Sequence, residues 1–180
     1  MNSLQADSTN ISLEAKRRIC SDVKDISNSN IDGIHYSHDQ DHILRAKAVI
    51  IGPEGTPYSH AMFLFNIKYP GDYPFSPPVF EFVNYGSTNR IHPNFYATGK
   101  VCLSVLNTWP VGRPWTSCMT VKSILLNLQS VLTSDPLTHE PGFTSKHQDS
   151  SNYACAVRYL SFKENLIDHF TRGFAGFDFF

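Results

Sequence analysis

One cysteine and one asparagine are spaced so that they could carry out acyl transfer. Asn94 follows a histidine and a proline, and Cys102 comes after seven intervening residues that include a glycine. A turn stiffened by proline and reversed at glycine would bring the asparagine amide near the thiol. A thiolate can hold an activated acyl group as a thioester, and an amide donor can hydrogen-bond the oxyanion that forms. The pattern therefore predicts acyl-transfer chemistry at Cys102.

The alternative at this position is a buried structural cysteine. Free cysteine is among the most often buried residue types, and buried thiols are usually inert. Three neighbouring features favour the functional interpretation: a tyrosine- and proline-rich stretch at residues 69–78, Trp115, and an amphipathic segment at residues 120–132. In this order and at about these spacings, they resemble the catalytic core of the ubiquitin-conjugating enzymes. The resemblance covers residues 12–170.

The resemblance implies an α+β fold of the ubiquitin-conjugating (UBC) type, in which an N-terminal helix precedes a four-stranded antiparallel meander, a central helix and C-terminal helices. It implies that Cys102 accepts ubiquitin, or a ubiquitin-like protein, from an activating enzyme as a thioester and passes it to a lysine amine, usually with a ligase. The family's asparagine, which stabilises the oxyanion or orders the nearby loop, falls on Asn94. His92 and Pro93 are expected to be structural.

The family resemblance also implies where partners dock. Basic first-helix positions, which meet the activating enzyme and often the ligase, correspond to Arg17 and Arg18. Without the resemblance these charges would be read as a solvated helix face. Tyr69 lies where the family carries a ligase-contacting aromatic, and Ser117 and Cys118 stand in a loop that is usually Ser-Pro-Ala. The expected partners are ubiquitin or a ubiquitin-like protein, an activating enzyme, a ligase and protein substrates; no cofactor is expected, because the activating enzyme consumes ATP upstream.

A longer active-site loop is most similar to the Z-type branch of the family. Residues 107–114 move Trp115 farther along the chain than in the shortest members, and this insertion is expected to lie beside the thioester. A Glu-Pro-Gly-Phe run at residues 140–143 also fits that branch, whose members work with a second, less common activating enzyme. The family's acidic residue that tunes the incoming amine has no clear counterpart, and His139 and Glu140 are the candidates.

Length and composition favour a single domain. The chain has 180 residues, of which 41% are hydrophobic, and this supports one compact core. A formal net charge of -1 offers no basic stripe for nucleic acid and no polybasic run for anionic lipid. No apolar stretch approaches the length of a membrane span. We therefore expect a monomer with protein partners, no nucleic acid and no membrane, in the cytoplasm, the nucleus or both.

Cysteine and histidine usage argues against disulfides and metal. The four cysteines include no Cys-x-x-Cys pair, which fits a reducing compartment, and none of the eight histidines is paired at ligand spacing. No metal site is expected. Two alternatives to the carrier function remain: a non-catalytic relative of the same fold that binds ubiquitin, and a cysteine hydrolase in which His92 or His139 acts as a base toward Cys102.

Local patterns predict the elements that must position the site. Ser12 is the expected N-cap of a helix at residues 13–26. Period-two alternation and turn residues predict strands at residues 33–36, 43–51, 61–69 and 79–83. The prolines of residues 69–78 exclude a central strand there, and the bond between Tyr73 and Pro74 is a candidate for the cis form.

Two helical regions are expected after the cysteine. Thr120 is the expected cap of a helix that runs to residue 132 and is stopped by Pro136. Ser151 is the expected cap of a final helix that runs to about residue 170, with Gly173 as its terminator. The predicted domain boundaries are a flexible N-terminus at 1–11, the core domain at 12–171, and an aromatic tail at 172–180 that is expected to pack on the domain.

Overall fold

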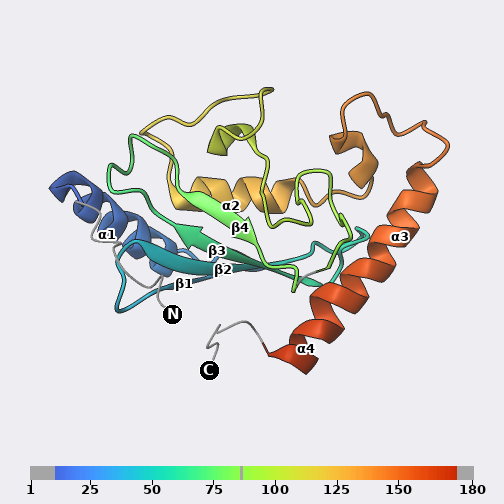
Figure 1. Ribbon diagram of the computed structural model, residues 1–180, viewed down its shortest axis with the longest axis horizontal. Coiled ribbons are helices and arrows are strands. Elements are labelled where there is room, and N and C mark those ends of the chain that lie inside the picture. Colours follow the sequence, from blue (N-terminus) through green and yellow to red (C-terminus); the bar gives the residue numbers. More distant parts are fainter. Residues whose placement is uncertain (1–10, 86, 174–180) are drawn as a thin grey trace, which may run out of the picture.

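The computed structural model describes residues 11–85 and 87–173, in which four strands form one antiparallel sheet. β1 (Ile34–His38), β2 (Arg45–Ile51), β3 (Met62–Lys68) and β4 (Val79–Phe82) lie side by side in that order. α1 (Leu13–Asn28) precedes the sheet; α2 (Val121–Ser130), α3 (Ser150–Phe162) and α4 (Asp168–Arg172) follow it. Figure 1 shows α1 at one end of the sheet, α2 across it, and α3 with α4 at the other end. The predicted α+β meander is confirmed. Predictions for residues 1–10 and 174–180 lie outside the described residues.

One face of the sheet carries the core. Alternate side chains of β3 point to this face, so that Phe63, Phe65 and Ile67 are buried together. They lie opposite smaller side chains of β2, with Ala48 paired to Phe65 and Ile50 paired to Phe63. α2 covers this layer with its buried residues Val121, Ile124, Leu125 and Leu128.

Ser12 is the N-cap of α1, as predicted. Its hydroxyl accepts a hydrogen bond from the Ala15 N–H at 3.0 Å, which satisfies one of the free donors of the first turn. Its own N–H donates to the Gly71 carbonyl at 3.1 Å. The start of α1 is therefore tied to the proline-rich loop, residues 69–78.

The proline-rich loop is held from both sides. The bond between Tyr73 and Pro74 is cis, as predicted. The Trp115 indole donates to the Pro74 carbonyl at 2.7 Å, and its ring lies 5.9 Å from that of Tyr73. This contact fixes the chain segment that follows the insertion against the loop that follows β3.

α2 begins as predicted but ends earlier. Thr120 and Ser123 form a reciprocal capping box, with their N–H to hydroxyl bonds at 3.1 and 3.2 Å. The helix ends at Ser130, not at residue 132. The next carbonyl, that of Val131, accepts a hydrogen bond from the His92 ring, so it is engaged outside the helix. The prediction that Pro136 stops α2 was wrong, since Pro136 instead opens the 3₁₀ turn η2 (Pro136–His139).

The last helix starts one residue before the predicted cap. Ser150 is its first residue and Asp149 occupies the N-cap position without a side-chain capping bond, so the prediction of Ser151 was wrong. The Ser150 hydroxyl is directed instead to Asp135 Oδ1, at 2.6 Å. A π-helical turn, η3 (Lys163–Ile167), joins α3 to α4, and Gly173 at φ +76° ends the helical run as predicted.

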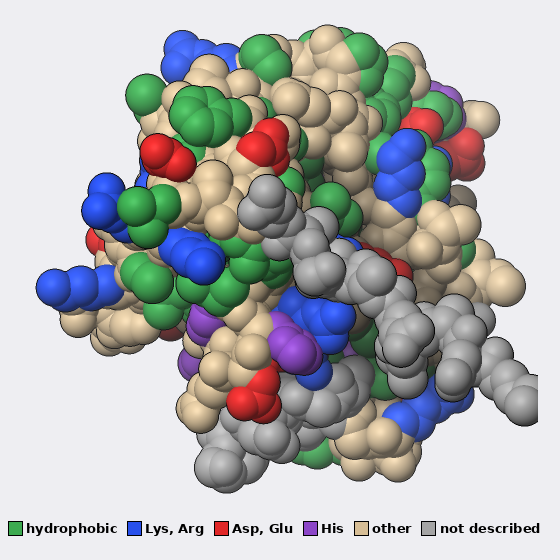
Figure 2. All heavy atoms as spheres, turned by 60° about the vertical axis from the view of Figure 1, so that its left-hand side comes forward, with side chains coloured by type: hydrophobic (Ala, Val, Ile, Leu, Met, Phe, Trp, Pro, Cys, Tyr) green, Lys and Arg blue, Asp and Glu red, His purple; other side chains and the backbone are tan. Residues whose placement is uncertain are grey.

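The described surface is mixed in charge. Figure 2, turned to bring the α1 side forward, shows Lys and Arg side chains scattered among acidic and hydrophobic ones on the visible described surface, without one basic stripe. Within residues 11–85 and 87–173, no helix combines the length and the apolar character needed to cross a bilayer. The same residues contain no group of three His, Cys, Asp or Glu side chains placed to hold a metal ion.

Candidate active site

The structure brings Asn94 and Cys102 together through two hydrogen bonds. The Cys102 N–H donates to the Asn94 carbonyl at 2.9 Å, and Asn94 Nδ2 donates to the Cys102 carbonyl at 2.6 Å. Between them the chain forms a short hairpin with an antiparallel bridge from Phe95 to Val101. The predicted proximity of the amide to the cysteine is thus present, although the amide engages the cysteine backbone.

Glycine is required at the turn of this hairpin. Gly99 has a φ of +84°, which side chains rarely tolerate, and its carbonyl accepts from the Phe82 N–H at 2.8 Å. A Cβ on Gly99 would lie 3.0 Å from Glu81 Cγ and 3.1 Å from the Phe82 carbonyl oxygen. The turn therefore packs tightly against β4, which fixes the depth at which Cys102 is held.

His92 anchors the other end of the hairpin. Its Nδ1 accepts from the Asn94 N–H at 2.9 Å, so Nε2 carries the proton and donates to the Val131 carbonyl at 2.9 Å. The ring is fully buried, and this burial lowers the pKa of His92 to about 3. The neutral imidazole is therefore a fixed support between the site and the end of α2.

The geometry excludes His92 as a catalytic base toward Cys102. Both ring nitrogens are engaged with the backbone, and the depressed pKa opposes proton uptake. His139 lies 5.1 Å from His92 between ring centroids, and its Nε2 is 3.2 Å from the Thr133 hydroxyl. Burial lowers the pKa of His139 as well. The hydrolase alternative, which needs a His–Cys dyad, finds no support in these contacts.

Glu140, the acidic candidate, is paired with an arginine. Arg90 Nη2 lies 3.1 Å from Glu140 Oε2, and the same guanidinium donates to the Pro93 carbonyl. It also lies over the Tyr96 ring, at 4.3 Å from the centroid. Glu140 thus helps to hold the loop that carries Asn94, and the structure does not bring it to Cys102.

Cys102 is more enclosed than a carrier cysteine is expected to be. Only 3% of its surface is exposed, although it lies outside the apolar core cluster that contains its neighbours Val101 and Leu103. Asn94 is also buried, and its Oδ1 has no hydrogen-bond partner in the described structure. Cys102 is therefore held beneath the surface.

The insertion at residues 107–114 lies beside Cys102, and Thr108 fastens it there. The Thr108 hydroxyl donates to the Val101 carbonyl at 2.9 Å and accepts from the Leu103 N–H at 2.9 Å, so it binds both neighbours of the cysteine. Its N–H donates to the Leu103 carbonyl at 3.2 Å. Sequence reasoning missed Thr108, because nothing local marks a threonine that bonds backward to the chain.

Other residues of the insertion have separate surroundings. Trp109 is half-buried, whereas Arg113 is exposed. Asn107, at φ +56°, accepts a hydrogen bond from the Trp115 N–H at 2.9 Å. Gly112 passes so close to Ser104 that a Cβ would lie 2.6 Å from its hydroxyl. The insertion is folded back onto the chain on both sides of its tip.

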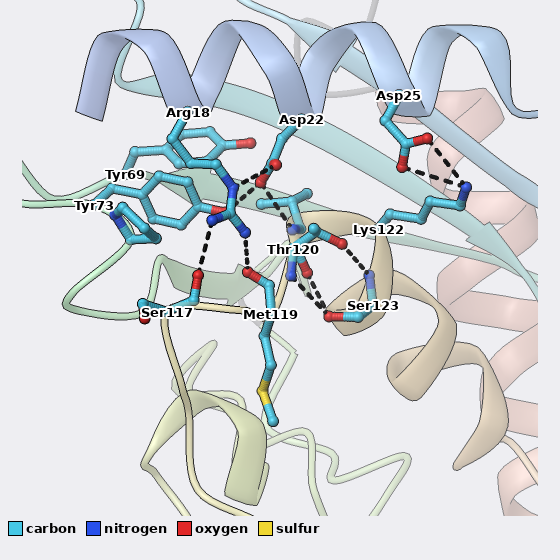
Figure 3. Close-up of polar contacts among 12 residues, drawn as sticks. Arg18, Asp22, Asp25, Tyr69, Tyr73, Ser117, Met119, Thr120, Lys122 and Ser123 are labelled. Carbon is cyan, nitrogen blue, oxygen red and sulfur yellow. Dashed lines mark hydrogen bonds and ion pairs between the residues drawn. The ribbon is translucent and has the colours of Figure 1, made fainter. Parts of the chain in front are cut away.

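The predicted partner-binding residues divide into three exposed and two constrained ones. Arg17, Ser117 and Cys118 are exposed. Arg18 is half-buried, and its guanidinium donates hydrogen bonds to two loop carbonyls, as Figure 3 shows. Tyr69 is fully buried, and its hydroxyl oxygen lies 2.8 Å from that of Tyr36.

The prediction for Tyr69 therefore needs correction, because a fully buried ring offers no surface to a partner. Tyr69 instead packs edge-on against Tyr73, with 5.1 Å between ring centroids, and burial raises its pKa. Phe75, in the same loop, is 70% exposed. The exposed aromatic side chain of the proline-rich loop is thus Phe75, which the sequence pattern did not single out.

Comparisons with known proteins agree with this architecture. The sequence model of the family described as "Ubiquitin-conjugating enzyme" matches residues 18–160. The ubiquitin-conjugating enzyme E2 Z of Danio rerio is 35% identical over 165 residues, covering 90% of this chain and 50% of that protein. The E2 Z of Homo sapiens is 36% identical over 154 residues, covering 84% and 43%. "Probable ubiquitin-conjugating enzyme protein 17" of Caenorhabditis elegans is 38% identical over 136 residues, covering 71% and 18%.

The predicted likeness to the Z-type branch is confirmed by the two E2 Z proteins. The chain spans half the length, or less, of these relatives. The matched region includes most of α1, the whole sheet, the Asn94–Cys102 hairpin and α2. This chain therefore belongs to the ubiquitin-conjugating enzyme family.

Proposed function

We propose that this chain accepts ubiquitin, or a ubiquitin-like protein, as a thioester on Cys102 and transfers it to a lysine amine. The observation that carries the proposal is the paired hydrogen bonding of Asn94 with Cys102, at 2.6 and 2.9 Å, in a member of a family named for this reaction. The pairing fixes an amide donor at the cysteine, where an acyl group would be held.

The reaction comprises two acyl transfers without redox change. In loading, the Cys102 thiolate attacks the carbonyl carbon of a thioester on the activating enzyme; a new C–S bond forms and the activating enzyme's thiolate leaves. In discharge, a lysine amine attacks the same carbonyl carbon, an amide forms, the amine gives up a proton and the Cys102 thiolate leaves. His92 takes no part in this proton transfer, because both of its nitrogens hold the backbone.

We assign Asn94 one role before the reaction and another during lysine attack. In the structure it uses Nδ2 to hold the Cys102 carbonyl. The amide carries a second hydrogen on Nδ2, which is the donor that we assign to the oxyanion formed during lysine attack. The same side chain would thus order the loop and stabilise the developing charge.

The enclosure of Cys102 makes access part of the mechanism. With 3% of the residue exposed, loading requires the neighbouring chain to move aside. The insertion at residues 107–114 is the segment that we expect to move, because its mainly exposed residues are fastened beside the cysteine chiefly through Thr108.

The partners follow from the proposed reaction: ubiquitin or a ubiquitin-like cargo, an activating enzyme, a ligase and substrate proteins. ATP would be consumed by the activating enzyme, so this chain would need no cofactor of its own. The similarity to E2 Z proteins leads us to include a second, less common activating enzyme among the partners to test.

A gel assay tests the proposal. The chain is incubated with activating enzyme, ATP and ubiquitin, and the products are separated with and without reductant, across a panel of activating enzymes and ubiquitin-like proteins. We expect an adduct of one cargo molecule that thiol removes. Cys102→Ser should leave either no adduct or a thiol-resistant ester, while Cys20→Ser, Cys118→Ser and Cys155→Ser, at exposed positions, should each still form an adduct that thiol removes.

The burial of Cys102 favours testing one alternative, a non-catalytic relative that binds ubiquitin without forming a thioester. In that case no activating enzyme of the panel would yield an adduct, whereas ubiquitin would still bind to the chain in solution. A thiol-sensitive adduct with any cargo rules this alternative out.

A further inference from the structure

Two nitrogens of the Arg18 side chain join α1 to the loop that precedes α2, and the third bonds within α1. Arg18 Nε donates to Asp22 Oδ1 at 2.8 Å, one turn along the helix. Nη1 donates to the Ser117 carbonyl at 2.8 Å, and Nη2 donates to the Met119 carbonyl at 2.5 Å. Figure 3 shows the guanidinium reaching from α1 to both carbonyls. Because the guanidinium is planar and always protonated, it fixes the relative positions of the groups it binds.

A buried acid holds this arginine in place. Asp22 is 3% exposed, and its Oδ2 accepts hydrogen bonds from the Tyr73 hydroxyl and, at 3.4 Å, from the Val121 N–H. Burial and the bond to Asp22 raise the pKa of Tyr73, which keeps its proton and its role as donor. The guanidinium carbon lies 5.7 Å from the centre of the Tyr73 ring. The orientation of Arg18 is therefore set before any partner arrives.

The loop that Arg18 binds presents its side chains outward. Ser117 and Cys118 are exposed, while the carbonyls of Ser117 and Met119 turn toward the helix. The Met119 N–H donates to the Thr116 carbonyl at 2.9 Å, which closes the turn directly before the capping box of α2. The arginine thus acts on the shape of the loop and leaves its outer surface open.

The neighbouring Arg17 has different surroundings from Arg18. Arg17 is exposed, and in the described part of the chain it makes no hydrogen bond or ion pair. Sequence reasoning grouped Arg17 and Arg18 as one basic docking surface. The structure separates them into an exposed charge and a residue whose three side-chain nitrogens are all engaged.

We propose that Arg18 is a positioning residue, which holds residues 116–119 in the shape that docks the activating enzyme. Arg17, Ser117 and Cys118 supply the surface that the partner touches. This inference rests on the proposed function, since it assigns a role within partner docking, but its structural half can be measured on the chain alone.

The first measurement is hydrogen exchange at the Met119 amide, in Arg18→Ala and in Arg17→Ala as the matched control. We expect Arg18→Ala to speed exchange at least about tenfold, because two charge-assisted bonds to the loop are lost. Arg17→Ala should exchange at the wild-type rate. Arg18→Lys should resemble Arg18→Ala, because an ammonium cannot reproduce the fork that binds both carbonyls.

The second measurement is loading kinetics on the same variants. Arg18→Ala and Arg18→Lys should raise the KM of the activating enzyme for this chain by about tenfold. The discharge of the preloaded thioester to free lysine, measured without ligase, should keep its rate. If Arg18→Ala does not fold, as judged by circular dichroism, Arg18→Lys decides the case.

Two results would overturn the inference. One is exchange at Met119 that stays at the wild-type rate in the Arg18 variants, because the loop would then keep its shape without the arginine. The other is faster exchange without any change in KM, because the shape would then not matter for docking. Failure of the wild-type chain to take up any cargo contradicts the proposed function instead, and it leaves the exchange result readable.

Discussion

At the scale of single residues, His92 connects the site to the rest of the fold. Its neutral ring joins the Asn94 N–H to the Val131 carbonyl, and it packs 4.8 Å from the Phe95 ring and 5.7 Å from the Tyr58 ring between centroids. An imidazolium could not accept from Asn94, so protonation would break the anchor of the hairpin. The position of the amide beside Cys102 therefore depends on His92 remaining neutral.

This dependence predicts how stability varies with pH. The folded pKa of His92 is about 3, whereas its ordinary value is 6.5. Between these values the unfolded chain binds a proton that the folded chain does not, so the contribution of His92 is complete above pH 6.5 and is lost as the pH falls. His92→Gln should cost about 2 kcal/mol of unfolding free energy at neutral pH, through lost hydrogen bonds and packing.

The measurement is urea unfolding of wild type and His92→Gln at neutral pH and at about pH 5. The difference between the two proteins should shrink by about 1 to 2 kcal/mol at the lower pH, because glutamine does not titrate. A difference that stays constant with pH would show that the neutral state of His92 contributes nothing to the dependence.

Asn94 permits a second test at the residue scale. Asn94→Ala removes the donor assigned to the oxyanion, and loss of such a donor typically lowers turnover on the order of 100-fold to 1000-fold. Discharge to lysine should therefore slow much more than loading, in single-turnover assays. Asn28→Ala, at an exposed position, serves as control. Equal slowing of both steps would mean that Asn94 only orders the hairpin.

At the scale of elements, the insertion and the hairpin form one unit around Cys102. The hairpin is set by the Gly99 turn, and the insertion is fastened to it by the Thr108 hydroxyl. Much of the insertion is exposed, including Val111 at 72%. A segment with few buried apolar contacts opens at low free-energy cost, so Thr108 should control access to the cysteine.

Thr108→Val tests this control because it removes the hydroxyl and keeps the shape. In a background with the other three cysteines changed to serine, alkylation of Cys102 should speed about three- to tenfold, from the loss of hydrogen bonds worth about 1 kcal/mol. Mass spectrometry measures the rate. Thr98→Val, at an exposed threonine of the hairpin, should alkylate at the wild-type rate; the same rate in both variants would contradict a role for Thr108.

Elements with local signals were predictable from the sequence, and those set by distant contacts were not. Ser12 and Thr120 were identified as caps because their hydroxyls act within three residues. α2 ends two residues before the predicted end, and the Val131 carbonyl just beyond it is bound by His92, 39 positions away. Likewise Ser150 bonds to Asp135, 15 positions earlier, which no local pattern reports.

At the scale of the whole molecule, the site too was predictable where its contacts are local and not where they join distant segments. The spacing of Asn94 and Cys102 predicted their pairing, because the hairpin between them is local. The burial of Tyr69 and the engagement of Arg18 arise where α1, the proline-rich loop and the loop before α2 meet, as Figure 3 shows. A sequence resemblance assigns positions to a surface, and packing decides which of them remain free.

The proposed acyl transfer depends on Cys102 as the single acyl carrier. The most direct measurement is intact-mass spectrometry of a variant that keeps only this cysteine, Cys20→Ser with Cys118→Ser and Cys155→Ser, after incubation with activating enzyme, ATP and ubiquitin. We predict a mass increase of one ubiquitin less one water, which excess thiol reverses and which a matched variant with Cys102→Ala never gains. The same thiol-sensitive increase in the Cys102→Ala variant, or none in the variant that retains Cys102 with any cargo and activating enzyme, would contradict the account.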